Sequence, residues 1–168
     1  MDAFCPLRHA LPLLASILLF CACSRQAADG RNAAAEGNKG TRTENAMHNG
    51  KRTMRLSIDK AVFTATLEDN DTAWELVKRL PLRLEMTELN DNEKYASPGE
   101  PLPAKAVKVG RIEAGDVMLW GDDCLVVFYK SFFTPYSYTR IGRIVDAEGL
   151  AKAVGSGNVR IDFREAGK

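Results

Sequence analysis

Histidine, the side chain best suited to acid–base catalysis near neutral pH, is almost absent from this chain. The only two copies are His9 and His48, and both precede the region that we expect to fold. A Ser-His-Asp or Cys-His arrangement and histidine-bound zinc are therefore not expected in the domain. Asp116, Asp122 and Asp123 lie near glycine turns without the spacing of a calcium loop, so turn formation explains them. We expect no metal site, no cofactor and no catalytic residue.

Aromatic side chains are the second group that could form a site, because they provide binding surfaces for apolar groups. Seven of the 13 aromatic residues fall between residues 120 and 138, and Pro135 interrupts this segment. Loop geometry there could leave rings facing a groove that takes a small ligand or an extended peptide. The alternative is that these rings only seal the mouth of a barrel. The predicted binding residues are Trp120, Tyr129, Phe132, Phe133, Tyr136, Tyr138 and Arg140.

The first 22 residues have the pattern of a secretion signal. Arg8 and His9 precede an apolar run over residues 10–20, which is shorter than the roughly 20 residues that span a bilayer. The segment Phe20-Cys21-Ala22-Cys23 resembles the lipobox of bacterial lipoproteins. The resemblance implies cleavage after residue 22 and a lipid anchor on Cys23. Because Ser24 follows, it also implies a location in the cell envelope, on the periplasmic face of the outer membrane.

Residues 23–52 are expected to form a flexible linker. From residue 24 onward the linker contains six alanines, four glycines and nine charged residues, with Met47 as its one large apolar side chain. Such a composition cannot bury enough surface to offset the entropy of ordering. The linker carries a net charge of +3 and the following domain −2, which argues against a nucleic-acid partner.

Residues 53–168 form the predicted domain, and their patterns favour many short strands. An alternating hairpin is expected over residues 54–67. Residues 69–72 offer several N-caps for a helix of about ten residues, whose apolar stripe runs from 73 to 80 and which Pro81 stops. A long loop without periodicity, residues 90–103, is a candidate binding loop. The remaining predicted elements are strands at 82–86, 107–109, 117–120, 124–129, 141–145 and 159–163, and a helix at 147–154. The fold class is mainly β: a closed, mostly antiparallel barrel with two short helices.

The segment from Gly115-Asp116 to Phe128-Tyr129, with the strand 141–145, resembles the C-terminal half of cyclophilins. Residues 54–168 as a whole are similar to a small bacterial cyclophilin-like family of poorly known function. The resemblance implies about eight barrel strands, and cyclophilins isomerise peptidyl-prolyl bonds. However, Arg83 is the only arginine on the strand that carries the catalytic arginine in cyclophilins, and the groove histidine of that family falls on Tyr138.

Three functions follow from these patterns. The first is an envelope lipoprotein whose cyclophilin-like domain binds a small ligand or an extended peptide without catalysis. The second is a peptidyl-prolyl cis-trans isomerase acting on envelope proteins, and the third is a structural partner in an envelope complex. The sequence does not predict the oligomeric state.

Overall fold

The structure, a computed structural model, describes residues 47–48 and 51–166. The predicted signal segment, the lipidation site Cys23 and most of the predicted linker lie outside these residues. In the described part, strand pairing starts before the predicted domain boundary at residue 53, because β1 (Met47–His48) pairs with β2 (Lys51–Ile58).

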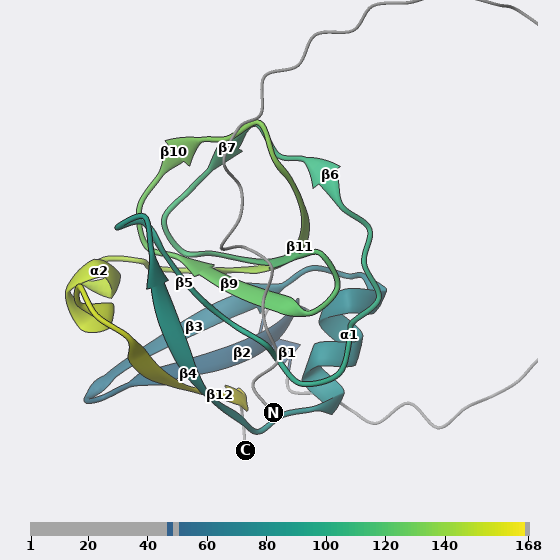
Figure 1. The fold of residues 1–168 in the computed structure, drawn as a ribbon. Coiled ribbons are helices and arrows are strands. Elements are labelled where there is room, and N and C mark those ends of the chain that lie inside the picture. Colours follow the sequence, from purple (N-terminus) through teal and green to yellow (C-terminus); the bar gives the residue numbers. More distant parts are fainter. Residues whose placement is uncertain (1–46, 49–50, 167–168) are drawn as a thin grey trace, which may run out of the picture. The chain divides into compact units, whose positions relative to one another are not determined.

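The described elements are mostly short strands (Figure 1). After β2 come β3 (Ala61–Leu67), α1 (Asp71–Lys78), β4 (Leu82–Leu89), β5 (Glu93–Ala96), β6 (Val107–Lys108) and β7 (Arg111–Ile112). The second half contains β8 (Asp116–Trp120), β9 (Cys124–Phe128), β10 (Phe132–Phe133), β11 (Ser137–Ile144), α2 (Leu150–Val154) and β12 (Val159–Glu165).

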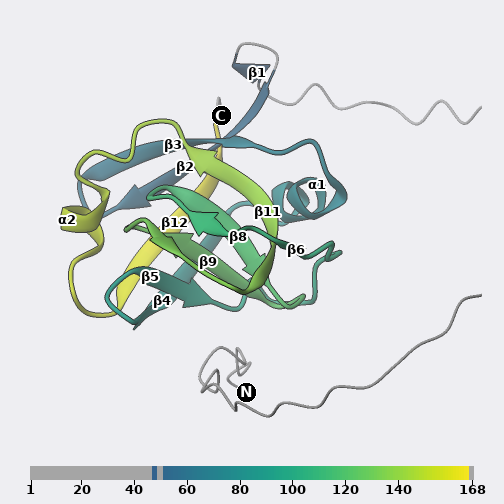
Figure 2. The same cartoon turned by 90° about the horizontal axis from the view of Figure 1, so that it is seen from above.

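Eight of these strands close into a barrel in the order β2-β12-β4-β5-β9-β8-β11-β3, and β3 pairs again with β2. Each of these pairs is antiparallel. The predicted closed eight-stranded barrel with two helices is therefore confirmed. The helices α1 and α2 lie on opposite sides of it (Figure 2). Since the whole ring lies within residues 51–165, a fragment that begins at Lys51 contains the complete barrel.

The strands β8 and β9 are buried on both faces, which gives the domain two hydrophobic clusters. Val117, Leu119, Leu125 and Val127 point into the barrel and pack in its main core. Their neighbours Met118, Cys124, Val126 and Phe128 point outward and pack in a second cluster, as alternation along a strand requires. An uninterrupted apolar strand therefore signals that something covers the outer wall as well.

The cover is a pair of extended segments, residues 107–112 and 132–138, which we call the arch. Its two ends are held by antiparallel pairs, β6 with the start of β11 and β7 with β10. Between them, the amide of Thr134 donates a hydrogen bond to the carbonyl of Gly110 at 2.9 Å. Figure 1 shows the arch standing off the barrel wall at β9 and β5.

One local expectation differs from the structure, and another is confirmed. The predicted loop 90–103 contains β5, whose sequence Glu-Lys-Tyr-Ala has no apolar alternation, because partners on both sides, β4 and β9, supply the pairing. The helix α1 begins at Asp71, and its N-cap is one of the predicted capping residues: the Asn70 side chain accepts a hydrogen bond from the amide of Ala73 at 2.9 Å.

A buried lysine ties β5 to the far end of the chain. Lys94 is fully buried, and its ammonium donates to the carbonyls of Gly155 at 2.8 Å and Gly157 at 2.6 Å. It also forms an ion pair with Glu88, whose carboxylate accepts a hydrogen bond from the Tyr129 hydroxyl. These contacts join β4, β5 and β9 to the turn between α2 and β12.

Replacing Lys94 with methionine, Lys94→Met, is expected to lower the free energy of unfolding by about 3 kcal/mol, because Glu88 and two carbonyls would lose their buried partner. Urea unfolding measures this change, with the exposed Lys152→Met on α2 as the control. A loss no larger than that of the control would show that the Lys94 cluster does not hold the barrel end.

Candidate functional site

A cleft of about 470 Å³ opens where the start of α1 meets β11 and the segment 103–107. One edge of β11 has a gap in its strand pairing, and the cleft lies at this gap. Residues 142–144 of β11 pair with β3, whereas residues 137–138 pair with β6. The cleft is lined by Asp69, Asn70, Asp71, Thr72, Pro103, Ala104, Lys105, Val107, Thr139 and Arg140.

The most distinctive side chain in this cleft is Arg140, which is 40% exposed. Its Nη1 atom lies 3.6 Å from Oδ2 of Asp116, a carboxylate that is almost completely buried. The same carboxylate pairs with Arg143 at 3.6 Å and accepts a hydrogen bond from the amide of Glu113 at 2.9 Å. Asp116 thus restricts where the Arg140 guanidinium can point, without removing it from solvent.

Several polar groups around the cleft already have partners that fix its walls. The Thr72 hydroxyl donates to the carbonyl of Pro103 at 2.5 Å, and the Thr139 hydroxyl accepts from the amide of Lys105 at 2.8 Å. The Asn70 amide group donates to the carbonyl of Arg140 at 2.8 Å. These three contacts join α1, the segment 103–105 and β11. The walls therefore combine fixed backbone with cations and the exposed carboxylates Asp69 and Asp71.

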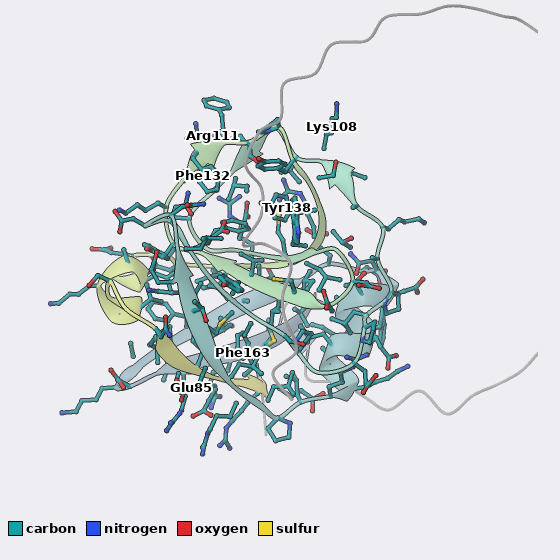
Figure 3. All side chains as sticks on the ribbon, in the orientation of Figure 1. Glu85, Lys108, Arg111, Phe132, Tyr138 and Phe163 are labelled. Carbon is teal, nitrogen blue, oxygen red and sulfur yellow. The ribbon has the colours of Figure 1, made fainter. Side chains whose placement is uncertain are left out.

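Four of the predicted aromatic residues are brought together, three of them from the arch itself, but not around the cleft. Trp120 lies edge-on to Tyr136 with ring centroids 5.4 Å apart and contacts Tyr138 at 5.1 Å. Phe128 links Tyr138, at 5.5 Å, to Phe132, at 5.8 Å. These five rings form a continuous row along the outer face of the barrel. All but Tyr136, which is 39% exposed, belong to or pack against the second hydrophobic cluster. Figure 3 shows Tyr138 and Phe132 between the arch and the barrel.

The other predicted residues lie apart from this row. Phe133 is 78% exposed on the arch, where the Arg111 guanidinium lies 4.9 Å from its ring centre. Tyr129 is buried with the main core and bonded to Glu88. Burial, reinforced by Glu88, raises the pKa of the Tyr129 hydroxyl above its ordinary value. Of the predicted site residues, Arg140 is the one that lines the cleft.

The comparison with known protein families agrees with this barrel. Residues 56–164 match the cyclophilin-like family. The chain belongs to this family. The solved structures include a match to the hypothetical protein AF2241 from Archaeoglobus fulgidus, with a TM-score of 0.49 and 19% identity, covering 69% of this chain and 95% of that one. No curated protein matches the chain.

In this cyclophilin-like domain, the two positions that the sequence analysis compared with cyclophilins can now be located. Arg83 lies on the outward face of β4, where its Nε atom is 2.6 Å from a carboxylate oxygen of Asp162. Tyr138 is 3% exposed and packs against Trp120 and Phe128. Neither side chain lines the cleft.

The cyclophilin-like domain also buries a carboxyl group that the sequence analysis missed. Glu93 on β5 is 3% exposed and shares a face of the strand with Tyr95, beside the second hydrophobic cluster. Burial, together with the negative charge of Glu88, raises its pKa to about 7. The Glu93 charge in turn contributes to the raised pKa of Tyr138, after burial of that hydroxyl.

Some signals for the cleft were present in the sequence. The run 69–72 was noted as a source of helix caps, and loop 90–103 as a binding loop that ends at a residue of the cleft wall, Pro103. Nothing in the sequence indicated that these two segments meet beside Arg140. Within the described residues, no group of three or more metal-ligating side chains occurs, and neither helix has the length and apolarity to cross a bilayer.

The variant Glu93→Gln should stabilise the cyclophilin-like domain increasingly as the pH rises from about 4.5 to 7. Below the ordinary pKa of 4.5 the carboxyl is neutral in both states. As the pH rises, it ionises first in the unfolded chain, so the wild type loses stability until the folded pKa is passed. Above pH 7 the expected gain is on the order of 3 kcal/mol.

This gain is measured as the difference in the free energy of unfolding between Glu93→Gln and the wild type across pH 4 to 8, with the exposed Glu148→Gln as the control. A pH-independent difference would show that the Glu93 carboxyl titrates normally.

Proposed function

We propose that this domain is a binding module that takes an extended peptide in the cleft beside α1, without catalysis. The observation that carries the proposal is Arg140, an exposed guanidinium in the cleft wall whose position the buried Asp116 restricts. A guanidinium donates to peptide carbonyl groups, and the exposed carboxylates Asp69 and Asp71 accept from amide or ammonium groups. A peptide backbone offers both kinds of group along its length.

The shape of the cleft supports a peptide or a small polar ligand. Its volume of about 470 Å³ falls in the range of small-ligand sites. The first turn of α1 presents backbone N–H groups, of which Ala73 is already bound by Asn70. Val107, 55% exposed, adds an apolar contact at the rim.

The isomerase alternative is less well supported. Rotation about a prolyl bond is accelerated by a donor aimed at the prolyl nitrogen in a dry, apolar pocket. Arg83 is 63% exposed and engaged by Asp162, and the rings of the aromatic row pack against one another. The third possibility, a structural partner in an envelope complex, has no specific observation in its favour.

The test uses residues 51–168 and the peptide acetyl-Ala-Ala-Pro-Ala-amide, titrated by NMR. Arg140→Ala is expected to weaken binding about tenfold, because a hydrogen bond from a charged donor is lost. Arg143→Ala is the matched control: it removes the other arginine paired with Asp116 but does not line the cleft. Its affinity should stay within about twofold of the wild type.

Equal losses in the two arginine variants, or no binding at all, would contradict the proposed site. The same samples report cis-trans exchange of the prolyl bond. If the wild type accelerates this exchange and Arg140→Ala does not, the domain is an isomerase and not a binding module.

We further propose that Cys23 carries a lipid that holds the protein in the envelope, as the lipobox-like segment indicates. The wild type should incorporate radioactive palmitate when it is produced in bacteria, whereas Cys23→Ser should not, because the acceptor thiol is gone. Cys21→Ser is the control and should retain the label. Unchanged labelling of Cys23→Ser would refute the anchor.

A further inference from the structure

The arch exposes apolar side chains that the barrel does not cover. Phe133, Val107 and Tyr136 are 78%, 55% and 39% exposed, and they make up three of the five exposed large hydrophobic residues in the described part of the chain. The other two, Val62 and Val145, lie outside the arch. Exposure concentrated in one place marks an interaction surface, whereas single exposed residues do not.

The charged side chains of the arch itself are all cationic. Residues 101–112 contain Lys105, Lys108 and Arg111 but no carboxylate, and residues 131–138 contain no charged residue. The domain from residue 53 onward nevertheless carries −2 in total. Among the described residues, Arg111 has an ion-pair partner, Glu113, whereas neither lysine is within ion-pair distance of a carboxylate. The arch and the adjoining Lys105 therefore place two unpaired lysines and one paired arginine on a domain of net negative charge.

Cationic and apolar groups occupy the same outer edge. Figure 3 places Lys108 and Arg111 on the side of the arch away from the barrel, whereas Tyr138 lies beneath it. The Arg111 guanidinium lies over the Phe133 ring at 4.9 Å. The second cluster behind this edge, including Phe128 and Tyr138, is buried. The exposed groups therefore lie next to a closely packed, buried cluster.

We propose that the arch is an interfacial surface that binds anionic phospholipid bilayers. Phe133 and Val107 would enter the boundary between headgroups and acyl chains, and Lys105, Lys108 and Arg111 would contact lipid phosphates. A projecting edge with several exposed apolar side chains fits a flat, deformable surface better than an acidic peptide or a nucleic acid, because either of these needs a groove or a longer cationic track. The inference does not depend on Cys23. It shares Lys105 and Val107 with the cleft wall, whereas Phe133, Lys108 and Arg111 lie outside that wall.

The experiment measures co-sedimentation of residues 51–168 with vesicles of phosphatidylcholine alone and of an equal mixture with phosphatidylglycerol. The domain should bind the mixed vesicles, and added salt should weaken binding. Phe133→Ser should lower the partition coefficient about tenfold, given the apolar area involved. Lys108→Gln should lower it about fivefold, as expected for one basic residue near an anionic surface.

Matched controls outside the arch are Val145→Ser and Lys60→Gln, which remove an exposed apolar group and an exposed cation. Both should bind like the wild type, and circular dichroism checks that all variants are folded. The proposal is overturned by equal losses in the controls, by no preference for the anionic vesicles, or by an unaffected Phe133→Ser. Tighter binding to a poly-glutamate peptide or a single-stranded oligonucleotide than to the vesicles would also overturn it.

Discussion

The arrangement of this domain depends on the burial of β8 and β9 on both faces. A barrel strand normally buries one face and exposes the other. Here the outward residues, such as Met118, Val126 and Phe128, are as apolar as the inward ones, and exposing them would cost hydrophobic free energy at each position. The arch covers them. Its position in turn sets the course of β6 and of the start of β11, which leaves the gap beside α1 in which the cleft opens.

A second consequence is the separation of aromatic packing from the polar cleft. The row that contains Trp120, Tyr138 and Phe128 completes the outer cluster. The cleft, by contrast, is formed by backbone segments that Asn70, Thr72 and Thr139 hold together. Because side chains fill the barrel interior, a ligand has to bind on the outer surface.

The parts of the fold that local patterns encode could be predicted from the sequence. The hairpin of β2 and β3 alternates clearly, and α1 has an apolar stripe and ends before Pro81. By contrast, β5 takes its conformation from neighbours that are distant in sequence, so its own residues carried no signal. The aromatic residues were recognised as a group, but which face of a strand each one occupies depends on the register. Arg140 is part of the cleft because residues 69–72 and 103–107 meet beside it, and this contact is tertiary.

The central claim, that the domain works through its outer wall beside α1, is tested most directly by a crystal structure of residues 51–168 soaked with acetyl-Ala-Ala-Pro-Ala-amide. The account predicts peptide density against Arg140, Thr72 and the segment 103–107, with the barrel interior unchanged. Density inside the barrel or at either of its ends, with the cleft beside Arg140 left open, would contradict it.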